Sequence, residues 1–204
     1  KLLMLTFAIM FVGCKGNKTI DYPDSVTNAG SKLMLEGDWL KNPHEIDFDK
    51  LPKIPLEHTV VSDVTPDGVN QHNYLAYYDT RYWIMWSDGP GVEDRVGQVV
   101  KYSTSKDGLD WEKPKFLTSY PEGSGPESSH YNTRTDQGLR WISRGFWEYQ
   151  GEFLALVSLD EAAGFFGPSL SLYAFKWNKE TQSWEPHGMV MENAINNFPP
   201  KKLP

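Results

Sequence analysis

The sequence contains a single cysteine, Cys14, and only five histidines in 204 residues. One cysteine excludes a disulfide scaffold and any cysteine-rich zinc site. The histidines are scattered and none has HExxH-type spacing, so neither a metal nor another cofactor is predicted. Basic residues are also few, because 20 Lys and Arg stand against 27 Asp and Glu and the net charge is −7. No run of basic residues is available to neutralise phosphates, which argues against a nucleic-acid partner.

The chain also lacks an apolar run long enough for a transmembrane helix. Residues 2–12 are almost wholly apolar, but a span needs about 20 such residues. The run fits the apolar region of a secretory signal. Because Cys14 follows Val12 and Gly13, its end resembles a bacterial lipoprotein lipobox, although Phe11 replaces the usual Leu. The alternative is a buried apolar strand with a chance cysteine.

The lipobox resemblance implies how the protein is processed and where in the cell it is located. It implies cleavage before Cys14 and lipidation of the cysteine sulfur. Residues 1–13 are then a signal peptide, and the polar, aperiodic residues 14–32 form a tether. The expected location is the cell envelope, either periplasm or cell surface, with the lipid anchor as the only membrane contact.

What the sequence does contain is aromatic residues, glycine and proline. Trp, Tyr and Phe number 8, 10 and 10, with 17 Gly and 14 Pro. An aromatic content of 14% excludes disorder as the main state, because such a chain can collapse around its apolar side chains. Frequent turn residues and no amphipathic helix longer than two turns predict an all-β fold.

An internal repeat of 71 residues organises the β pattern. Residues 71–87 and 142–158 match in order, as two strands joined by a tight turn. Third strands follow at 99–103 and 170–174, and each unit ends in a hairpin that closes at Trp111 or Trp184. Four strands per repeat is typical of a β-propeller blade. A β-sandwich with coincidental spacing is the alternative.

The repeat also predicts an incomplete ring. Residues 33–204 hold about 2.5 units of this length, whereas propellers typically have 4–8 blades. We therefore expect residues 33–204 to be a partial propeller, the N-terminal part of a longer protein with six or seven blades.

One turn carries a family resemblance. Ser105, Asp107, Gly108 and Trp111 form an Asp-box-like turn, in which the carboxylate caps backbone amides and glycine takes a positive φ. With the repeat and the lipobox, the chain resembles the sialidase-like (BNR/Asp-box) propellers of Bacteroidetes glycan-degrading lipoproteins. The resemblance implies a glycosidase that removes a terminal sugar. The Arg-Ile-Pro motif of true sialidases is absent, so sialic acid and other acidic or deoxy sugars are all open as substrate.

Candidate site residues lie where the inner strands begin, since this end of a blade faces the propeller mouth. The predicted catalytic residues are His72, Tyr131 and Arg144. A histidine near its usual pKa can exchange protons at neutral pH, and an arginine can bind a carboxylate bidentately. The predicted substrate-binding residues are Gln71, Asn73, His130, Arg134, Trp86 and Trp147. Candidate acidic groups in nearby loops are Asp63, Asp67, Asp88, Glu93 and Asp94.

Each of these assignments has a structural alternative. His72 can be a satisfied histidine of the channel, Arg144 can pair with Glu148 or Asp136, and the tryptophans can belong to the blade core.

Three functions remain open from the sequence. The first is a sialidase-like glycoside hydrolase, and the second is a lyase that acts on uronates through His, Tyr and Arg. The third is a glycan-binding lipoprotein without catalysis. All three have a glycan as partner.

Overall fold

The computed structural model describes residues 55–63, 68–164 and 167–200. The chain divides into two compact units, residues 1–55 and 56–204, and every described strand belongs to the second. The predicted signal peptide, the tether, Cys14 and Asp67 lie outside the described residues. Within the described ranges, no helix has the length and apolarity needed to cross a membrane.

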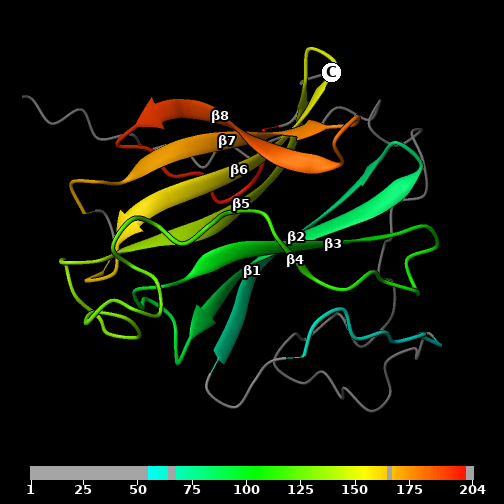
Figure 1. Cartoon of the computed structure of the whole chain (residues 1–204). Helices are drawn as coiled ribbons and strands as arrows, with labels where there is room; N and C mark the ends of the chain where they lie inside the picture. The colour runs from blue at the N-terminus through cyan, green and yellow to red at the C-terminus, as the bar shows by residue number, and fades with distance from the viewer. Residues whose placement is uncertain (1–54, 64–67, 165–166, 201–204) are drawn as a thin grey trace, which may run out of the picture. The chain divides into compact units, whose positions relative to one another are not determined.

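The described residues form eight strands in two antiparallel sheets of four (Figure 1). In each sheet the strands pair in sequence order, as an up-and-down meander. The first sheet consists of β1 (Gly68–Tyr78), β2 (Arg81–Pro90), β3 (Val99–Ser105) and β4 (Lys115–Phe116). The second consists of β5 (Leu139–Tyr149), β6 (Glu152–Glu161), β7 (Ser171–Asn178) and β8 (Ser183–Glu192). This is the build of two consecutive propeller blades, and the predicted all-β fold class is confirmed.

The 71-residue repeat is present in the strand boundaries. Each bound of β5 and β6 lies 71 residues after the corresponding bound of β1 and β2. Both hairpins turn through residues with positive φ, Asp79 and Thr80 in one and Gln150 and Gly151 in the other. Such turns match the right-handed twist of the strands that they join. The units differ at the outer edge, where β4 has two residues and β8 has ten.

The described strands make two blades. Residues 193–200 follow β8 and form no strand. They lie against the inner strands instead, because the Tyr74 hydroxyl donates to the Asn197 carbonyl at 2.7 Å.

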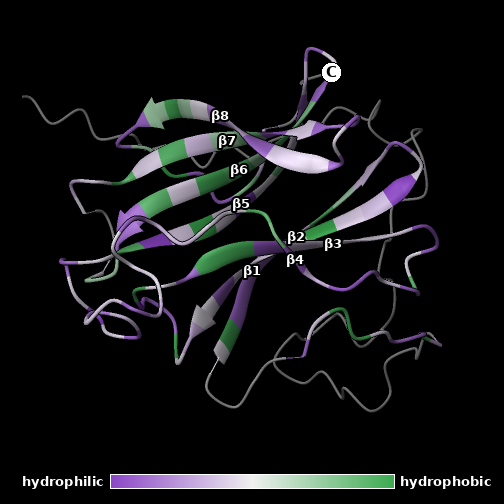
Figure 2. Cartoon of the chain, in the orientation of Figure 1, coloured by the Kyte–Doolittle hydropathy of each residue, from purple (hydrophilic) through white to green (hydrophobic). Residues whose placement is uncertain are grey.

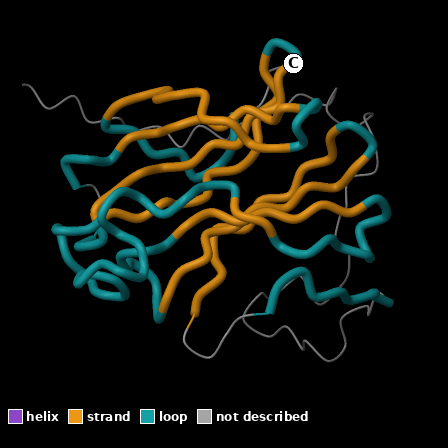
Figure 3. The backbone as a smooth tube through the Cα atoms, in the orientation of Figure 1, coloured by secondary structure: helices purple, strands orange, loops and turns teal. Residues whose placement is uncertain are grey.

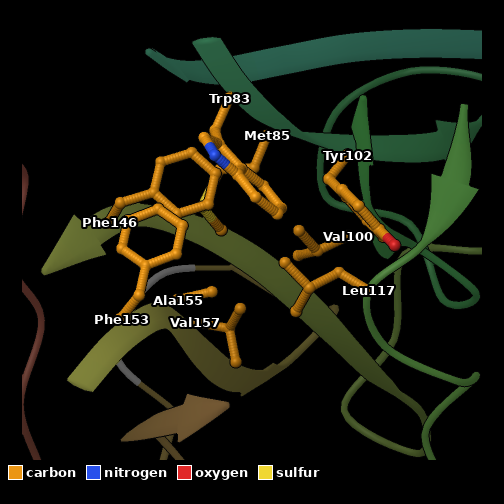
Figure 4. Close-up of a cluster of buried hydrophobic side chains, with 9 residues drawn as sticks. All are labelled: Trp83, Met85, Val100, Tyr102, Leu117, Phe146, Phe153, Ala155 and Val157. Carbon is orange, nitrogen blue, oxygen red and sulfur yellow. The ribbon is translucent and has the colours of Figure 1, made fainter. Parts of the chain in front are cut away.

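The main hydrophobic core lies between the two sheets. Trp83, Met85 and Val100 of the first sheet meet Phe153 and Val157 of the second (Figure 4). The ring centroids of Trp83 and Phe153 are 5.2 Å apart, edge to face. The hydrophobic colour in Figure 2 is concentrated on the central strands, β5 to β7 among them. Blade-to-blade burial therefore holds the inner strands in place.

The two ends of the blades differ. Hairpin turns join β1 to β2 and β7 to β8 at one end. Long loops, residues 91–98 and 117–138, gather at the other end, at the left of Figure 3. There the Val96 amide donates to the Thr133 carbonyl, and the Asn132 amide donates to the Val96 carbonyl, each at 3.0 Å. This pairing connects the two loops over the starts of β1 and β5.

Candidate active site

Both inner strands have a bulge near their start. The pairing of β1 with β2 shifts between Gln71 and Tyr74, and that of β5 with β6 shifts between Ser143 and Gly145. The bulges occupy equivalent points of the repeat. A bulge redirects the side chain of its extra residue and commonly occurs beside active sites. His72 lies in the first bulge, with φ of 53°, and Arg144 lies in the second.

His72 faces a carboxylate on the loop after β2. Its Nε2 lies 3.6 Å from Glu93 Oε1, and 33% of the His72 side chain is exposed. Burial, together with the positive charge of Arg144, holds the pKa of His72 below its usual value of 6.5, and Glu93 opposes this shift. The imidazole is therefore neutral at pH 7 and able to accept a proton.

Arg144 is buried directly beside this pair. Only 3% of the residue is exposed, and its Nε donates to Ser158 Oγ at 2.9 Å. Burial lowers the pKa of Arg144, while Tyr74 raises it. Arg144 thus interacts with Ser158 and Tyr74 rather than with the carboxylate of Glu148 or Asp136. Asn196 covers the strand here, because its Nδ2 donates to the Arg144 carbonyl at 3.3 Å.

A second buried arginine supports the same end of the site. Arg140 is 1% exposed and forms ion pairs with Asp94 and Asp160. It also donates to the Gly164 carbonyl at 3.1 Å. Burial raises the pKa of Asp160, and the charge of Arg140 opposes that shift. Asp94 in turn meets the exposed Arg134 at 3.3 Å.

Arg140 and Asp160 are absent from the site predicted from the sequence. They face each other in the register of β5 and β6. A sequence signal for this pair does exist. Arg140 and Asp160 are oppositely charged and occupy paired positions of two neighbouring apolar strands, and buried charges need partners.

Tyr131 lies in a separate hollow. Its ring covers Gly97, where an added Cβ would come within 2.3 Å of Cε2, and it meets Tyr120 edge to face at 6.4 Å. Burial and Tyr120 raise its pKa. The hollow measures about 440 Å³ and is lined by Asp88 as well. The structure thus places His72 and Arg144 together and Tyr131 apart from them, and Tyr74 is the tyrosine beside Arg144.

The predicted carboxylates fall into different environments. Asp88 pairs with Lys101 at 2.9 Å. Asp63 lines a neighbouring hollow with both of them. Among the predicted carboxylates that the structure describes, Glu93 is the one paired with His72.

The predicted substrate-binding residues also separate. Gln71 donates to Gln98 at 3.1 Å, and Gln98 donates to the Trp141 carbonyl at 2.9 Å, which makes this chain of hydrogen bonds a link between blades. Asn73 is exposed beside His72. His130 is half-buried, and its carbonyl caps the turn at Thr133.

The two predicted stacking tryptophans belong largely to the blades. Trp86 is 2% exposed, so its ring has no face open to a sugar in this structure. Trp147 stacks on Tyr149 at 4.5 Å and packs against the small second core formed by Leu156, Leu172 and Ala174.

The site contains no arrangement of metal ligands. In residues 55–63, 68–164 and 167–200, no three His, Cys, Asp or Glu side chains converge as they would on a metal ion. The groups available are a neutral histidine, the carboxylate beside it and the buried guanidinium of Arg144. They suit proton transfer and the attraction of negative charge.

No protein-family model matches the chain, and no curated protein does so. Solved structures show partial similarity. A sialidase has 20% identity and a TM-score of 0.48 over 66% of this chain. The Bacillus subtilis arabinanase Arb43A has 12% identity and a TM-score of 0.38 over 59%. An N-acetylgalactosamine deacetylase from F. plautii, in complex with blood group B trisaccharide, has 16% identity and a TM-score of 0.37 over 59%.

The chain spans only part of each of these proteins. The matched regions cover 13%, 38% and 30% of their respective chains.

Proposed function

We propose that this chain belongs to a glycan-processing enzyme, a glycoside hydrolase that removes a terminal acidic or deoxy sugar at the loop end of the blades. The observation that carries the proposal is the pairing of His72 with Glu93 directly beside the buried Arg144. Two consecutive blades present His72 and Arg144 from equivalent bulges. A ring of such blades would bring them to a common mouth.

The proposed roles follow from the environment of each group. Neutral His72 takes up a proton as general base, or returns it as general acid after charging. Glu93 stabilises the imidazolium that forms and holds its ring. Arg144 supplies positive potential beneath the mouth, which attracts an anionic sugar, whereas the charge of Arg140 is offset by Asp94 and Asp160.

A lyase that eliminates at a uronate is the second candidate. The supporting observation is Tyr74, which lies two residues after His72, where regular pairing of β1 resumes. Its side chain interacts with Arg144. In this reaction Arg144 would offset the uronate carboxylate charge, and His72 and Tyr74 would move protons. The product would be unsaturated and would absorb ultraviolet light.

The test is turnover by the complete gene product on sialylated, rhamnosylated and uronate-containing glycans, followed by released sugar and by ultraviolet absorbance. Released sugar without absorbance supports the hydrolase, and absorbance supports the lyase. We expect His72→Gln to lower kcat/KM by about 10²- to 10⁴-fold, the usual contribution of a general acid or base.

His58→Gln is the matched control, because His58 is exposed on the segment before β1. It should retain full turnover. Wild-type kcat/KM in His72→Gln would refute the assigned role. Saturable glycan binding without any product would identify the propeller as a recognition module instead.

A further inference from the structure

A second pocket lies at the opposite end of the blades from His72. It opens between the two sheets beside the β1–β2 and β7–β8 turns, and residues of both sheets line it. None of the residues used for the proposed chemistry lines it. All the lining residues belong to the described strands and turns.

The inner wall of this pocket is aromatic. Trp83, Tyr102 and Trp177 line it. The Trp83 and Trp177 centroids are 4.8 Å apart, nearly perpendicular, and Trp177 is only half-buried. In Figure 4 the Tyr102 hydroxyl points away from Phe146 and Phe153. Burial raises the pKa of Tyr102, and Lys115 and Glu112 act on it in opposite directions, so the phenol end lies near these charges.

The rim of the pocket is charged, with an excess of cations. Arg81 Nη1 and Lys115 Nζ donate to the two oxygens of Glu112, at 2.8 and 3.0 Å. Lys179 Nζ lies 3.1 Å from Asp79 Oδ2. Three cations thus share two carboxylates, in a chain whose net charge is −7. The hydrogen bond from Lys115 is the main cause that lowers the pKa of Glu112, which stays ionised.

The cations are accessible to a ligand. The side chains of Arg81, Lys115 and Lys179 are 37%, 57% and 57% exposed. Arg81 and Lys115 retain donors beyond those used on Glu112, since a guanidinium has five and an ammonium three. An anion that enters the pocket can therefore share both cations with Glu112.

We propose that this pocket binds one acidic sugar residue of a glycan. The apolar face of the sugar ring packs on Trp177, and its carboxylate or sulfate accepts hydrogen bonds from Arg81 and Lys115. An aromatic wall beside two cations suits a sugar ring that carries an anionic substituent. A purely apolar ligand would remove water from the charged side chains and offer them no hydrogen bonds in return. The pocket and the His72 end are separate, so this inference does not depend on turnover at the mouth.

The test is binding of defined oligosaccharides to the complete protein by titration calorimetry and tryptophan fluorescence. The probes are a hexuronate trisaccharide, a sulfated trisaccharide and the neutral trisaccharide of the same linkage. We expect an acidic probe to bind at least about tenfold more tightly than the neutral one, because charge-assisted hydrogen bonds are stronger than neutral ones. Which acidic probe binds tells carboxylate from sulfate.

Arg81→Gln and Lys115→Gln should each weaken binding of the acidic probe about tenfold. Lys176→Gln is the matched control, because it breaks a lysine–carboxylate pair, with Glu152, of similar exposure outside the pocket. Glu93→Gln alters the mouth and should leave this affinity unchanged. Equal affinity for acidic and neutral probes, or unchanged affinity in both pocket variants, overturns the proposal. A change of affinity in Glu93→Gln alone assigns the binding to the mouth.

Discussion

At the scale of single residues, the pKa of His72 depends on opposing neighbours. Burial and the charge of Arg144 favour the neutral imidazole, whereas Glu93 favours the charged form. The net effect is a folded-state pKa below 6.5. Between the folded and unfolded pKa values the unfolded chain binds more protons, so stability rises with pH through this window. The contribution of neutral His72 is complete above pH 6.5 and is lost as the pH falls through the lower, folded pKa.

This balance predicts the titration of His72. We expect the NMR titration of its ring protons to have a midpoint below 6.5, and Glu93→Gln to lower that midpoint further, because the variant removes the group that raises the pKa. The acidic limb of kcat/KM should move in the same direction. His72→Gln assigns the resonance by its disappearance, and His58→Gln should leave the midpoint in place. A midpoint that rises in Glu93→Gln would contradict the pairing of these two residues.

At the scale of elements, the two blades use equivalent turns after their third strands. Asp107 Oδ1 accepts the Leu109 and Asp110 amides at 2.8 and 2.9 Å. Asn178, 71 residues later, accepts the amides two and three residues on, at 2.9 and 3.1 Å. In the sequence, the second turn has Asn178 where the first turn has Asp107, so it lacks the acidic residue of the Asp-box pattern. An amide oxygen makes the same bonds, because only acceptor geometry is required.

The equivalence predicts the outcome of two substitutions at one position. Asp107→Ala removes the acceptor for both amides and should lower the Tm of the protein by a few degrees, roughly 2–4 °C. Asp107→Asn keeps an oxygen at the same place and should retain most of the wild-type Tm at pH 7. Thermal unfolding followed by circular dichroism measures both. If the two variants melted alike, the bonds of Asp107 would not stabilise this turn.

The strands are far more predictable from the sequence than the site. The turns after Tyr78 and Tyr149 follow from alternating apolar residues on both sides of a polar break, which is a local pattern. The bulges at His72 and Arg144 have no such pattern, because an extra residue in a ladder is defined by its partner strand. The placement of Tyr131 over Gly97 and the pairing of Arg140 with Asp160 depend on distances across many residues. Residue type singled out His72, Arg144 and Glu93 as candidates, and tertiary contacts decided which candidates lie together.

At the scale of the whole molecule, the two blades share the main hydrophobic core. Phe153 of β6 stacks on Tyr78 of β1 with centroids 4.1 Å apart and on Phe146 at 5.1 Å. It also meets Trp83 edge to face. One ring therefore contacts aromatic residues of both sheets. A change at this position acts on both blades at once, including the strands that carry His72 and Arg144.

Phe153→Ala should therefore destabilise both blades together. Phe153 is 3% exposed, and truncation of a buried phenylalanine costs about 3–5 kcal/mol of unfolding free energy. Val60→Ala is the control, because Val60 is 74% exposed and should change stability by no more than about 0.5 kcal/mol. Urea unfolding of the complete protein, followed by tryptophan fluorescence and by amide exchange in each sheet, measures the effect. Loss of amide protection in β5–β8 alone, with β1–β4 unchanged, would show that the blades are stabilised separately and that the arrangement of the site does not depend on their shared core.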